Sequence, residues 1–450
     1  MKLNFLFKFY IFFSLILFSC NAKKEIIEKK VKVEKNKYDS NEKILDTKIE
    51  NKYIYTDKVF DKSIKTLLCH KYGEPLSIPI LNLNSGDKLY FSFDVLNSEI
   101  ENYNYSILHC NSNWEQSDLI ENEFVDGFNK EPIINYEFSF NTLQDYVHYN
   151  FIFPSKNIKP LISGNYVFKV YAEDGSLAIY KRFMVIDKQI EIQAKIKKPS
   201  LPIYRYTKQE IDFSIFNHNF KIHDPFSDLI VVIKQNNSEN NMIDDLTPIF
   251  VKENELVYNY DDENNFFGNN EFRNFDIKSL RYQSQKIKNI VSDSLSNNVY
   301  LFKDKKRTFD RYSIQSDING NFLIHSQESW KNAIESDYAY IYFALDIDQT
   351  TLGNLYIIGK LTDWQLTEEN QLKYNKIKKQ YEGKLFLKQG YYDYMYALKD
   401  TIENKIDIGF VEGSHYETIN DYYIYVYYKS KVNRYTKLIG FHKISEKKLF

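Results

Sequence analysis

Hydrophobic residues recur in short alternating runs from about residue 63 onward. In the run "KLYFSFDVL" (88–96), every second residue from Leu89 to Val95 is apolar and falls on one face of an extended chain. Further runs bounded by polar turn residues lie at 104–110, 134–140, 148–154, 164–172 and 177–187. Because the runs are short and closely spaced, with no helical period sustained over three turns, they predict a β-sandwich.

The runs at 164–172 and 177–187 predict a β-hairpin. A Ser-Gly-Asn triplet (163–165) opens the first run, and polar residues at 173–176 separate it from the second. Turn residues at these positions favour a tight reversal between antiparallel strands.

Two further blocks continue the strand pattern to the C-terminus. The second begins near residue 190, and the third begins at Asp337, where tyrosines at every second position of 392–396 and of 423–427 share one face. We therefore predict an all-β fold with three β-sandwich domains in series, immunoglobulin-like or early-set-like, at 61–188, 189–336 and 337–450.

The first 20 residues have the layout of a lipoprotein-type signal peptide. Lys2 precedes an apolar run that Lys8 interrupts, and "LFSC" at 17–20 resembles a bacterial lipobox. We predict that Cys20 is lipidated and becomes the first residue of the mature chain; simple cleavage with loss of Cys20 is the alternative. The apolar run is short for a membrane-spanning helix.

Residues 21–60 are predicted to form a flexible charged tether. The part from 21 to 50 mixes charges of both signs and has one aromatic residue, Tyr38. A flexible chain of this length reaches about 30 Å on average, so a lipidated Cys20 would hold the domains near a membrane. A short helix at "EIIEKKVKVEK" (25–35) is the alternative.

The composition favours packed β domains, and the net charge argues against nucleic acid as a partner. Of 450 residues, 43% are hydrophobic and 17% aromatic, which suits packed β cores. The formal net charge is −2, so no basic surplus favours nucleic acid. Cys69 and Cys110 lack the spacing of metal ligands. In an exported chain the sequence is compatible both with a disulfide between them and with two free thiols.

The sequence contains no recognisable catalytic or cofactor motif. Its eight histidines show no metal-ligand spacing, and it has neither a glycine-rich phosphate loop nor a G-x-S-x-G nucleophile elbow. We therefore expect no catalytic, metal or cofactor site and no small-molecule substrate. A hydrolase with carboxylates from distant strands is the enzymatic alternative.

The surroundings of Trp364 raise a second alternative. "YIIGKLTDWQ" (356–365) and the later "GYYDYMYAL" (390–398) resemble the early-set sandwich of starch- and glycogen-binding modules. This shared pattern is mainly the framework of the sandwich, so we interpret Trp364 as a core or turn residue rather than a platform for sugar.

The stretch "NNFFGNNEFRNFD" (264–276) places an arginine among carboxylates and aromatic residues. We predict a turn at its glycine that leads into a strand, with Phe272 and Arg273 facing opposite ways. Glu271 lies on the face of Arg273 and is in place to pair with it. We predict that Arg273 is an ion-pair or hydrogen-bond hub of the middle domain. The candidate structural positions are Gly268, Glu271, Phe272, Arg273, Phe275 and Asp276.

The order of several motifs resembles the Plug protein family of the type IX secretion system of Bacteroidetes. They are "LNSGDKLYFSFDVL" (83–96), "YNYSILHCNSNWEQSDL" (103–119), "FFGNNEFRNFDIKSL" (266–280) and "GYYDYMY" (390–396). The resemblance covers about residues 60 to 447. In the family the turn often reads Gly-Gly before "NEFR", whereas this chain has Gly268-Asn269.

The resemblance implies a non-enzymatic periplasmic protein that associates with the outer-membrane translocon barrel. It implies that the protein seals the periplasmic opening of the pore when no cargo is present. A lipidated Cys20 would anchor it to the inner leaflet of the outer membrane, as its only contact with the membrane. A glycan-binding outer-membrane lipoprotein of a nutrient-uptake system is the alternative function.

Overall fold

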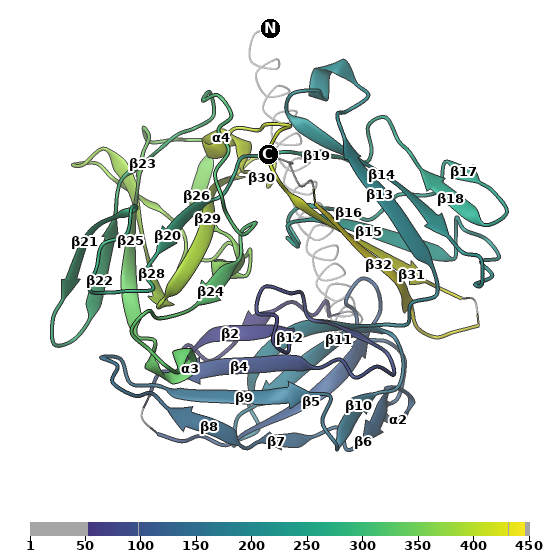
Figure 1. Ribbon diagram of the computed structural model, residues 1–450, viewed down its shortest axis with the longest axis horizontal. Coiled ribbons are helices and arrows are strands. Elements are labelled where there is room, and N and C mark those ends of the chain that lie inside the picture. Colours follow the sequence, from purple (N-terminus) through teal and green to yellow (C-terminus); the bar gives the residue numbers. More distant parts are fainter. Residues whose placement is uncertain (1–52, 98, 431, 446–450) are drawn as a thin grey trace, which may run out of the picture. The chain divides into compact units, whose positions relative to one another are not determined.

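Three β-sandwiches make up the part of the chain that the structure describes (Figure 1). The computed structural model describes residues 53–97, 99–430 and 432–445. The expected all-β fold of several sandwiches is confirmed. The predicted signal peptide with Cys20, and the tether up to residue 52, lie outside the described residues.

The N-terminal sandwich contains β1 to β12. One sheet has the order β1 (Lys58–Val59), β12 (Leu177–Ile186), β11 (Gly164–Tyr171), β5 (Tyr103–Cys110) and β7 (Glu131–Ile133), with β3 (Ile80–Asn82) beside β12. The facing sheet has the order β2 (Ile64–Lys71), β4 (Leu89–Val95), β9 (Val147–Phe153) and β8 (Asn135–Phe138). The short α2 (Glu121–Phe124) precedes a small ribbon of β6 (Val125–Gly127) and β10 (Ile158–Pro160).

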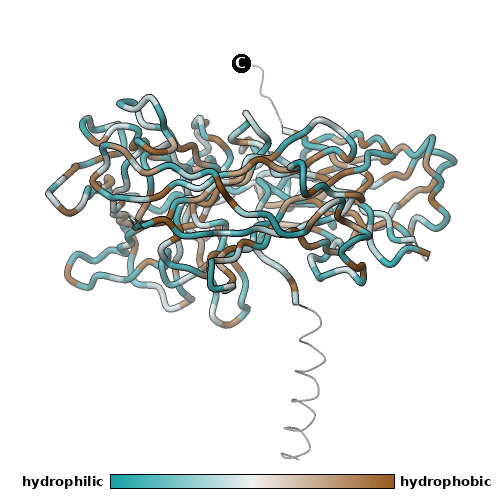
Figure 2. Tube along the Cα trace, turned by 90° about the horizontal axis from the view of Figure 1, so that it is seen from below, coloured by the Kyte–Doolittle hydropathy of each residue, from teal (hydrophilic) through white to brown (hydrophobic). Residues whose placement is uncertain are grey.

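Aromatic rings fill the space between these two sheets. The rings of Phe91 and Phe151 stack with centroids 4.7 Å apart, and those of Phe168 and Phe183 stack at 4.1 Å. Alternation along each strand sends every second side chain inward, which is why the apolar runs become core. Hydrophobic and hydrophilic stretches alternate along the chain, and many of the outer loops are hydrophilic (Figure 2).

The middle sandwich combines β13 to β19 with the last two strands of the chain. One sheet has the order β13 (Glu191–Lys197), β14 (Lys208–Phe216), β18 (Glu255–Tyr258) and β17 (Phe250–Val251), with β19 (Asn265–Phe267) beside β14. The other has the order β16 (Met242–Ile243), β15 (Leu229–Gln235), β31 (Asp421–Tyr428) and β32 (Lys437–Ser445). Figure 1 shows yellow β31 and β32 beside teal β15. A 3-10 turn, η1 (Pro202–Tyr204), precedes β14.

The C-terminal sandwich contains β20 to β30. In one sheet, β29 (Gly390–Asp400) pairs with β20 (Arg273–Asp276), β24 (Phe322–Ile324), β26 (Gly353–Ile358) and β30 (Ile406–Asp407). The other has the order β21 (Ile287–Ser292), β22 (Asn297–Leu301), β25 (Tyr338–Asp346), β28 (Gln380–Lys388) and β27 (Lys373–Asn375), with β23 (Asp304–Lys305) beside β25. Its short helices are α3 (Asn332–Glu335), η2 (Lys360–Thr362) and α4 (Gly409–Glu412).

The expected boundary between the second and third domains, at 336/337, is wrong. Strands β20 to β24, which begin at Arg273, share sheets with β25 to β30, so the C-terminal sandwich starts more than sixty residues earlier. Strands β31 and β32 leave that sandwich and pair with β15 instead. The middle sandwich is therefore discontinuous in sequence, and the C-terminal sandwich is inserted into it.

The expected end of the tether, at residue 60, is also too late. Tyr55 is buried, and its N–H donates to the carbonyl of Trp114 at 3.0 Å. Strand β1 pairs with β12, and the Asp57 carboxylate binds Lys181 at 2.6 Å. The chain thus joins the N-terminal sandwich at Tyr55.

Neighbouring sandwiches share buried contacts. Twelve buried apolar residues from the N-terminal and middle sandwiches form one common cluster, which includes Trp114, Tyr423 and Tyr425. Between the N-terminal and C-terminal sandwiches, the buried Asp94 carboxylate accepts from Lys388 Nζ at 2.6 Å and from the Tyr338 hydroxyl at 2.7 Å. Such contacts fix the sandwiches against one another more firmly than polar linkers would.

Candidate functional site

Two segments carry the chain between the middle and C-terminal sandwiches. Residues 268–272 connect β19 to β20, and residues 413–420 connect α4 back to β31. They run side by side: His415 N–H donates to the Asn269 carbonyl at 2.8 Å, and Asn269 N–H donates to Ser414 Oγ at 3.0 Å. We call these two segments, together with Arg273 and Glu412, the junction.

Gly268 is required by the close approach of the two segments. A Cβ atom at this position would lie 1.9 Å from the carbonyl oxygen of His415. The next residue, Asn269, has a φ of 53°, in the left-handed region that asparagine tolerates better than most residues. Asn420 Nδ2 donates to the Gly268 carbonyl at 2.9 Å, so the turn is held from the returning segment.

Asn270 and Glu271 also bind the returning segment. Asn270 Nδ2 donates to the Glu412 carbonyl at 2.8 Å, and its Oδ1 accepts the Glu271 N–H at 2.9 Å. The Glu271 carboxylate accepts the Ile419 N–H at 3.2 Å and the hydroxyl of Tyr312. These bonds satisfy backbone groups that no sheet ladder reaches.

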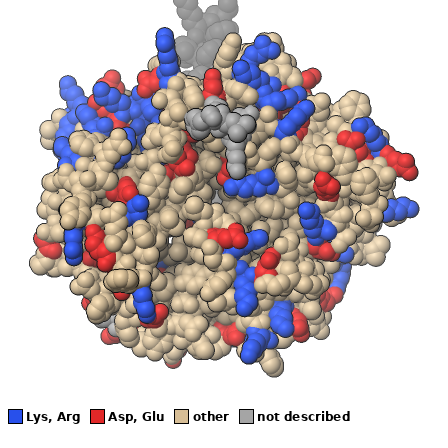
Figure 3. All heavy atoms as spheres, viewed as in Figure 1, with Lys and Arg blue, Asp and Glu red and all other residues tan. Residues whose placement is uncertain are grey.

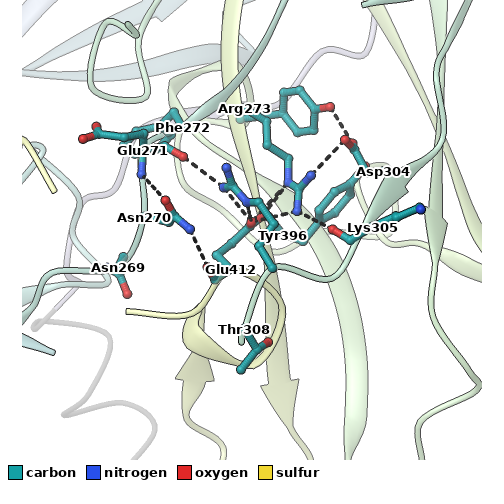
Figure 4. Close-up of polar contacts among 12 residues, drawn as sticks. Asn269, Asn270, Glu271, Phe272, Arg273, Asp304, Lys305, Thr308, Tyr396 and Glu412 are labelled. Carbon is teal, nitrogen blue, oxygen red and sulfur yellow. Dashed lines mark hydrogen bonds and ion pairs between the residues drawn. The ribbon is translucent and has the colours of Figure 1, made fainter. Parts of the chain in front are cut away.

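Arg273 occupies the centre of the junction (Figure 4). Its Nε donates to Glu412 Oε1 at 3.0 Å, and its Nη2 lies 2.9 Å from Glu412 Oε2. On the other side, Nη1 donates to Asp304 Oδ1 at 2.9 Å and Nη2 to the Lys305 carbonyl at 2.8 Å. The planar guanidinium therefore ties β20 to α4 and to β23 at once.

The carboxylate of Glu412 is fully buried and doubly paired. Arg307 Nε donates to Glu412 Oε2 at 2.8 Å, and Arg307 Nη2 donates to the Glu271 carbonyl at 2.9 Å. Burial opposes ionisation of Glu412, but the charges of Arg273 and Arg307 outweigh it and hold the pKa of Glu412 below its usual range. Loss of either arginine would leave this buried carboxylate with one cationic partner fewer, which is destabilising.

Phe272 faces away from Arg273 and contacts a second cluster. Its ring meets the indole of Trp364 edge-on, with centroids 6.0 Å apart. Trp364 is 7% exposed, which supports its interpretation as a core residue and leaves no open indole face for a sugar. Gly320 fits between these rings because any Cβ there would lie 2.6 Å from both.

An acidic pair lies directly behind Phe272. Asp317 Oδ2 accepts the Phe272 N–H at 2.5 Å, while Asp393 Oδ2, from β29, accepts the Ile318 N–H at 2.6 Å. Burial, and then the charge of Asp317, raise the pKa of Asp393 to about 8. Burial raises the pKa of Asp317 to about 6. Within the described residues, no group of three or more His, Cys, Asp or Glu side chains is arranged to hold a metal ion.

The predicted hub lies in a different domain from the one expected. Arg273 lies in β20 of the C-terminal sandwich, not in the middle domain, and the carboxylates on its guanidinium are those of Glu412 and Asp304. Phe275 belongs to the core of the same sandwich. Asp276 lies beyond the junction and pairs with Lys278 at 3.0 Å. Sequence reasoning missed Asp304, Arg307 and Glu412, because nothing in their local sequence marks them.

The two cysteines that the structure describes are free thiols. Cys110 is fully buried at the end of β5, and Cys69 is half-buried in β2. Burial raises the pKa of each thiol to about 12, so both are held in the protonated, unreactive form.

Comparisons with known proteins found a family match and a similar solved structure. Residues 64–187, the N-terminal sandwich, match the sequence model of the type 9 secretion system plug protein 1st domain. The chain is similar to a crystal structure of a hypothetical protein from Parabacteroides merdae ATCC 43184 at 2.30 Å resolution, with 32% sequence identity and a TM-score of 0.85, over 88% of this chain and 100% of that one. No curated protein matched.

The match to the first plug domain falls on one complete sandwich, and the likeness to the Parabacteroides protein extends through the junction to the other two. A role related to type IX secretion, at the cell envelope, follows from this kinship. The chain belongs to the plug protein family of the type IX secretion system.

Proposed function

We propose that this protein seals the periplasmic opening of the type IX outer-membrane translocon barrel when no cargo is present. Membership of the plug family carries the proposal. In this role the protein is a structural interaction partner of the barrel and catalyses no reaction.

The internal construction of the fold supports such a role. A seal across a wide pore must resist deformation, and each sandwich here is fastened to a neighbour by buried groups. Lys388 and Asp94 are each 1% exposed in their side chains, and the cluster around Trp114 is apolar. The junction adds the buried Arg273–Glu412 pair at the point where the chain crosses twice between sandwiches.

We also propose that Cys20 is lipidated and anchors the protein in the periplasm, at the inner leaflet of the outer membrane. The lipobox-like "LFSC" at 17–20 supports this placement. None of the helices in the described ranges is long and apolar enough to cross a membrane. A lipid chain on Cys20 would be the membrane contact.

Deletion of the gene in a strain that has the barrel tests the seal. We expect the outer membrane to admit large antibiotics that it normally excludes, and we expect the leak to vanish when the barrel gene is also deleted. Cross-linking of the native protein in intact cells should capture the barrel. An unchanged permeability together with no captured barrel would refute the proposal.

Protease treatment of intact cells separates this proposal from a glycan-uptake role. A periplasmic plug is protected from added protease until the outer membrane is broken. Loss of the protein from intact cells would favour surface display instead.

A further inference from the structure

A cleft of about 760 Å³ lies between the N-terminal and C-terminal sandwiches. One wall is formed by residues 57–67, from β1 and the start of β2, and the other by residues 360–370 and by residues 384–388 of β28. The volume is in the range of sites that bind small molecules or peptide segments. None of the junction residues lines it.

The first wall includes β2, which is an edge strand of its sheet. Strand β2 has a sheet neighbour, β4, on one side only. Its register with β4 shifts between Lys65 and Leu68, and Thr66 has a φ of 49°, so residues 66 and 67 stand outside the ladder. Edge strands accept extended peptides through main-chain hydrogen bonds. Because a bulge interrupts regular pairing, the backbone contact in this cleft is limited to the residues beside the bulge.

The charges that line the cleft are unbalanced. Four of its lysines form no ion pair with any residue that the structure describes: Lys58, Lys62, Lys65 and Lys384. The lining carboxylates of Asp57 and Asp363 are both bound by the buried Lys181, at 2.6 and 3.2 Å, and Asp363 is also bound by Lys360 at 2.6 Å. That leaves Asp61 and Glu369 as the opposing charges, so the cleft has a local positive surplus. Over the face drawn in Figure 3 the two signs are interspersed.

Aromatic rings border these lysines on β25 and β28. The rings of Tyr340 and Phe386 lie with centroids 4.6 Å apart, and Lys384 Nζ stands 4.3 Å above the Tyr340 ring. Both rings are partly exposed. They offer an apolar contact between the cationic groups, which suits a chain that carries both carboxylates and hydrophobic side chains.

We propose that this cleft binds an extended, acidic peptide segment of a partner protein. The open edge of β2 would pair with the backbone of the segment, the lysines would bind its Asp and Glu side chains, and the Tyr340 and Phe386 rings would contact its apolar ones. Anionic lipid or phosphate would engage the lysines but leave the strand edge unused. Peptide binding at this cleft is a separate property from sealing of the pore, and each proposal can be refuted without the other.

Binding of a synthetic peptide to the full-length mature protein tests the site. The probe is a fluorescent peptide of about ten residues with alternating Val and Glu, and its partner has Lys in place of Glu. Fluorescence anisotropy at low salt should show binding of the Glu peptide and none of the Lys peptide. Added salt should weaken the binding.

Matched charge reversals locate the binding. We expect Lys62→Glu/Lys65→Glu/Lys384→Glu to weaken it about tenfold or more. The control Lys130→Glu/Lys156→Glu/Lys159→Glu makes the same charge change at exposed lysines on the N-terminal sandwich, away from the cleft lining, and should change binding less than about twofold. If the reversed cleft variant does not fold, the Lys→Gln triple at the same positions replaces it and should also weaken binding.

Three outcomes would overturn the proposal. They are no binding of the Glu peptide, equal losses in the cleft and control variants, and cleft-dependent binding of phosphatidylglycerol vesicles without binding of the peptide. None of these bears on the permeability assay, so the site and the seal fail separately.

Discussion

The guanidinium of Arg273 and the carboxylate of Glu412 form a buried two-point ion pair, at 3.0 Å (Nε to Oε1) and 2.9 Å (Nη2 to Oε2). The two residues are 139 positions apart in the chain. One stands where the chain enters the C-terminal sandwich and the other where it leaves. The pair therefore closes the inserted sandwich at its base.

Removal of the guanidinium should destabilise the protein strongly. In Arg273→Ala the Glu412 carboxylate stays buried with Arg307 as its remaining cationic partner. Because a broken buried pair costs about 3–5 kcal/mol, we expect a loss of about 3 kcal/mol in the free energy of unfolding by urea. Lys378→Ala, which breaks the exposed pair with Glu382, should cost less than about 1 kcal/mol. A loss in Arg273→Ala no larger than in the control would show that Arg273 is not a hub.

Addition of one methyl group at Gly268 should disturb the crossing. In Gly268→Ala the new Cβ meets the backbone carbonyl of His415 at 1.9 Å, so the two segments must separate. We expect a loss of about 2 kcal/mol or more, seen as a lower melting temperature. Gly86→Ala is the matched control, because its Cβ would meet nothing within 4 Å. Equal melting temperatures for the two variants would contradict the close approach.

The buried carboxyl of Asp393 should make stability fall as the pH rises. Its pKa is raised from 3.8 to about 8, so between these pH values the folded state holds a proton that the unfolded state has released. The stability that this proton provides is complete below about pH 4 and is lost as the pH rises through about 8, by at most about 1.4 kcal/mol per pH unit.

Comparison with Asp393→Asn isolates this effect. The amide oxygen can still accept the N–H groups of Ile318 and Gly320, which Oδ2 of Asp393 accepts in the native chain. Urea unfolding across the window should show the wild type losing stability relative to Asp393→Asn as the pH rises. Asp145→Asn, an exposed position, should follow the wild type. A difference that stays constant with pH would refute the raised pKa.

Fragments of the chain should fold according to the sheets rather than the expected domain limits. A fragment of residues 270–413 contains β20 to β30, and we expect it to unfold in one cooperative transition. A fragment of residues 337–450 lacks β20 to β24 and leaves β31 without β15, so we expect no cooperative transition in its circular dichroism on heating. The opposite result would restore the boundary at 336/337.

The free thiols should be unreactive in the native protein. Iodoacetamide at mildly alkaline pH should label neither Cys69 nor Cys110, since burial raises the pKa of both to about 12. In urea, without a reductant, mass spectrometry should find both residues labelled. Labelling that requires a reductant would mean that the cysteines form a disulfide.

Local sequence patterns predicted the strands well, because the inward-facing positions of a strand recur every second residue. The hairpin expected at 164–172 and 177–187 is confirmed by the antiparallel pairing of β11 with β12. The tyrosines at alternate positions of 423–427 were likewise predicted to share one face, and Tyr423, Tyr425 and Tyr427 do lie in one cluster.

The local sequence did not show which distant strands pair with each other. Val231 pairs with Val426, and no local property of either strand identifies the other. The partners of Arg273 raise the same difficulty: Glu412 lies in a four-residue helix and Asp304 in a two-residue strand. Glu271, two positions from Arg273, was the partner that alternation alone suggested.

Because the middle sandwich is discontinuous in sequence, its fold depends on the last two strands of the chain. A ribosome that stops before residue 421 yields a polypeptide in which β15 has no neighbour at β31 and the Trp114 cluster loses Tyr423, Tyr425 and Tyr427. Such a product exposes apolar surface at two places at once, where proteases and chaperones act. A single truncation would thus damage both the middle sandwich and its contact with the N-terminal sandwich.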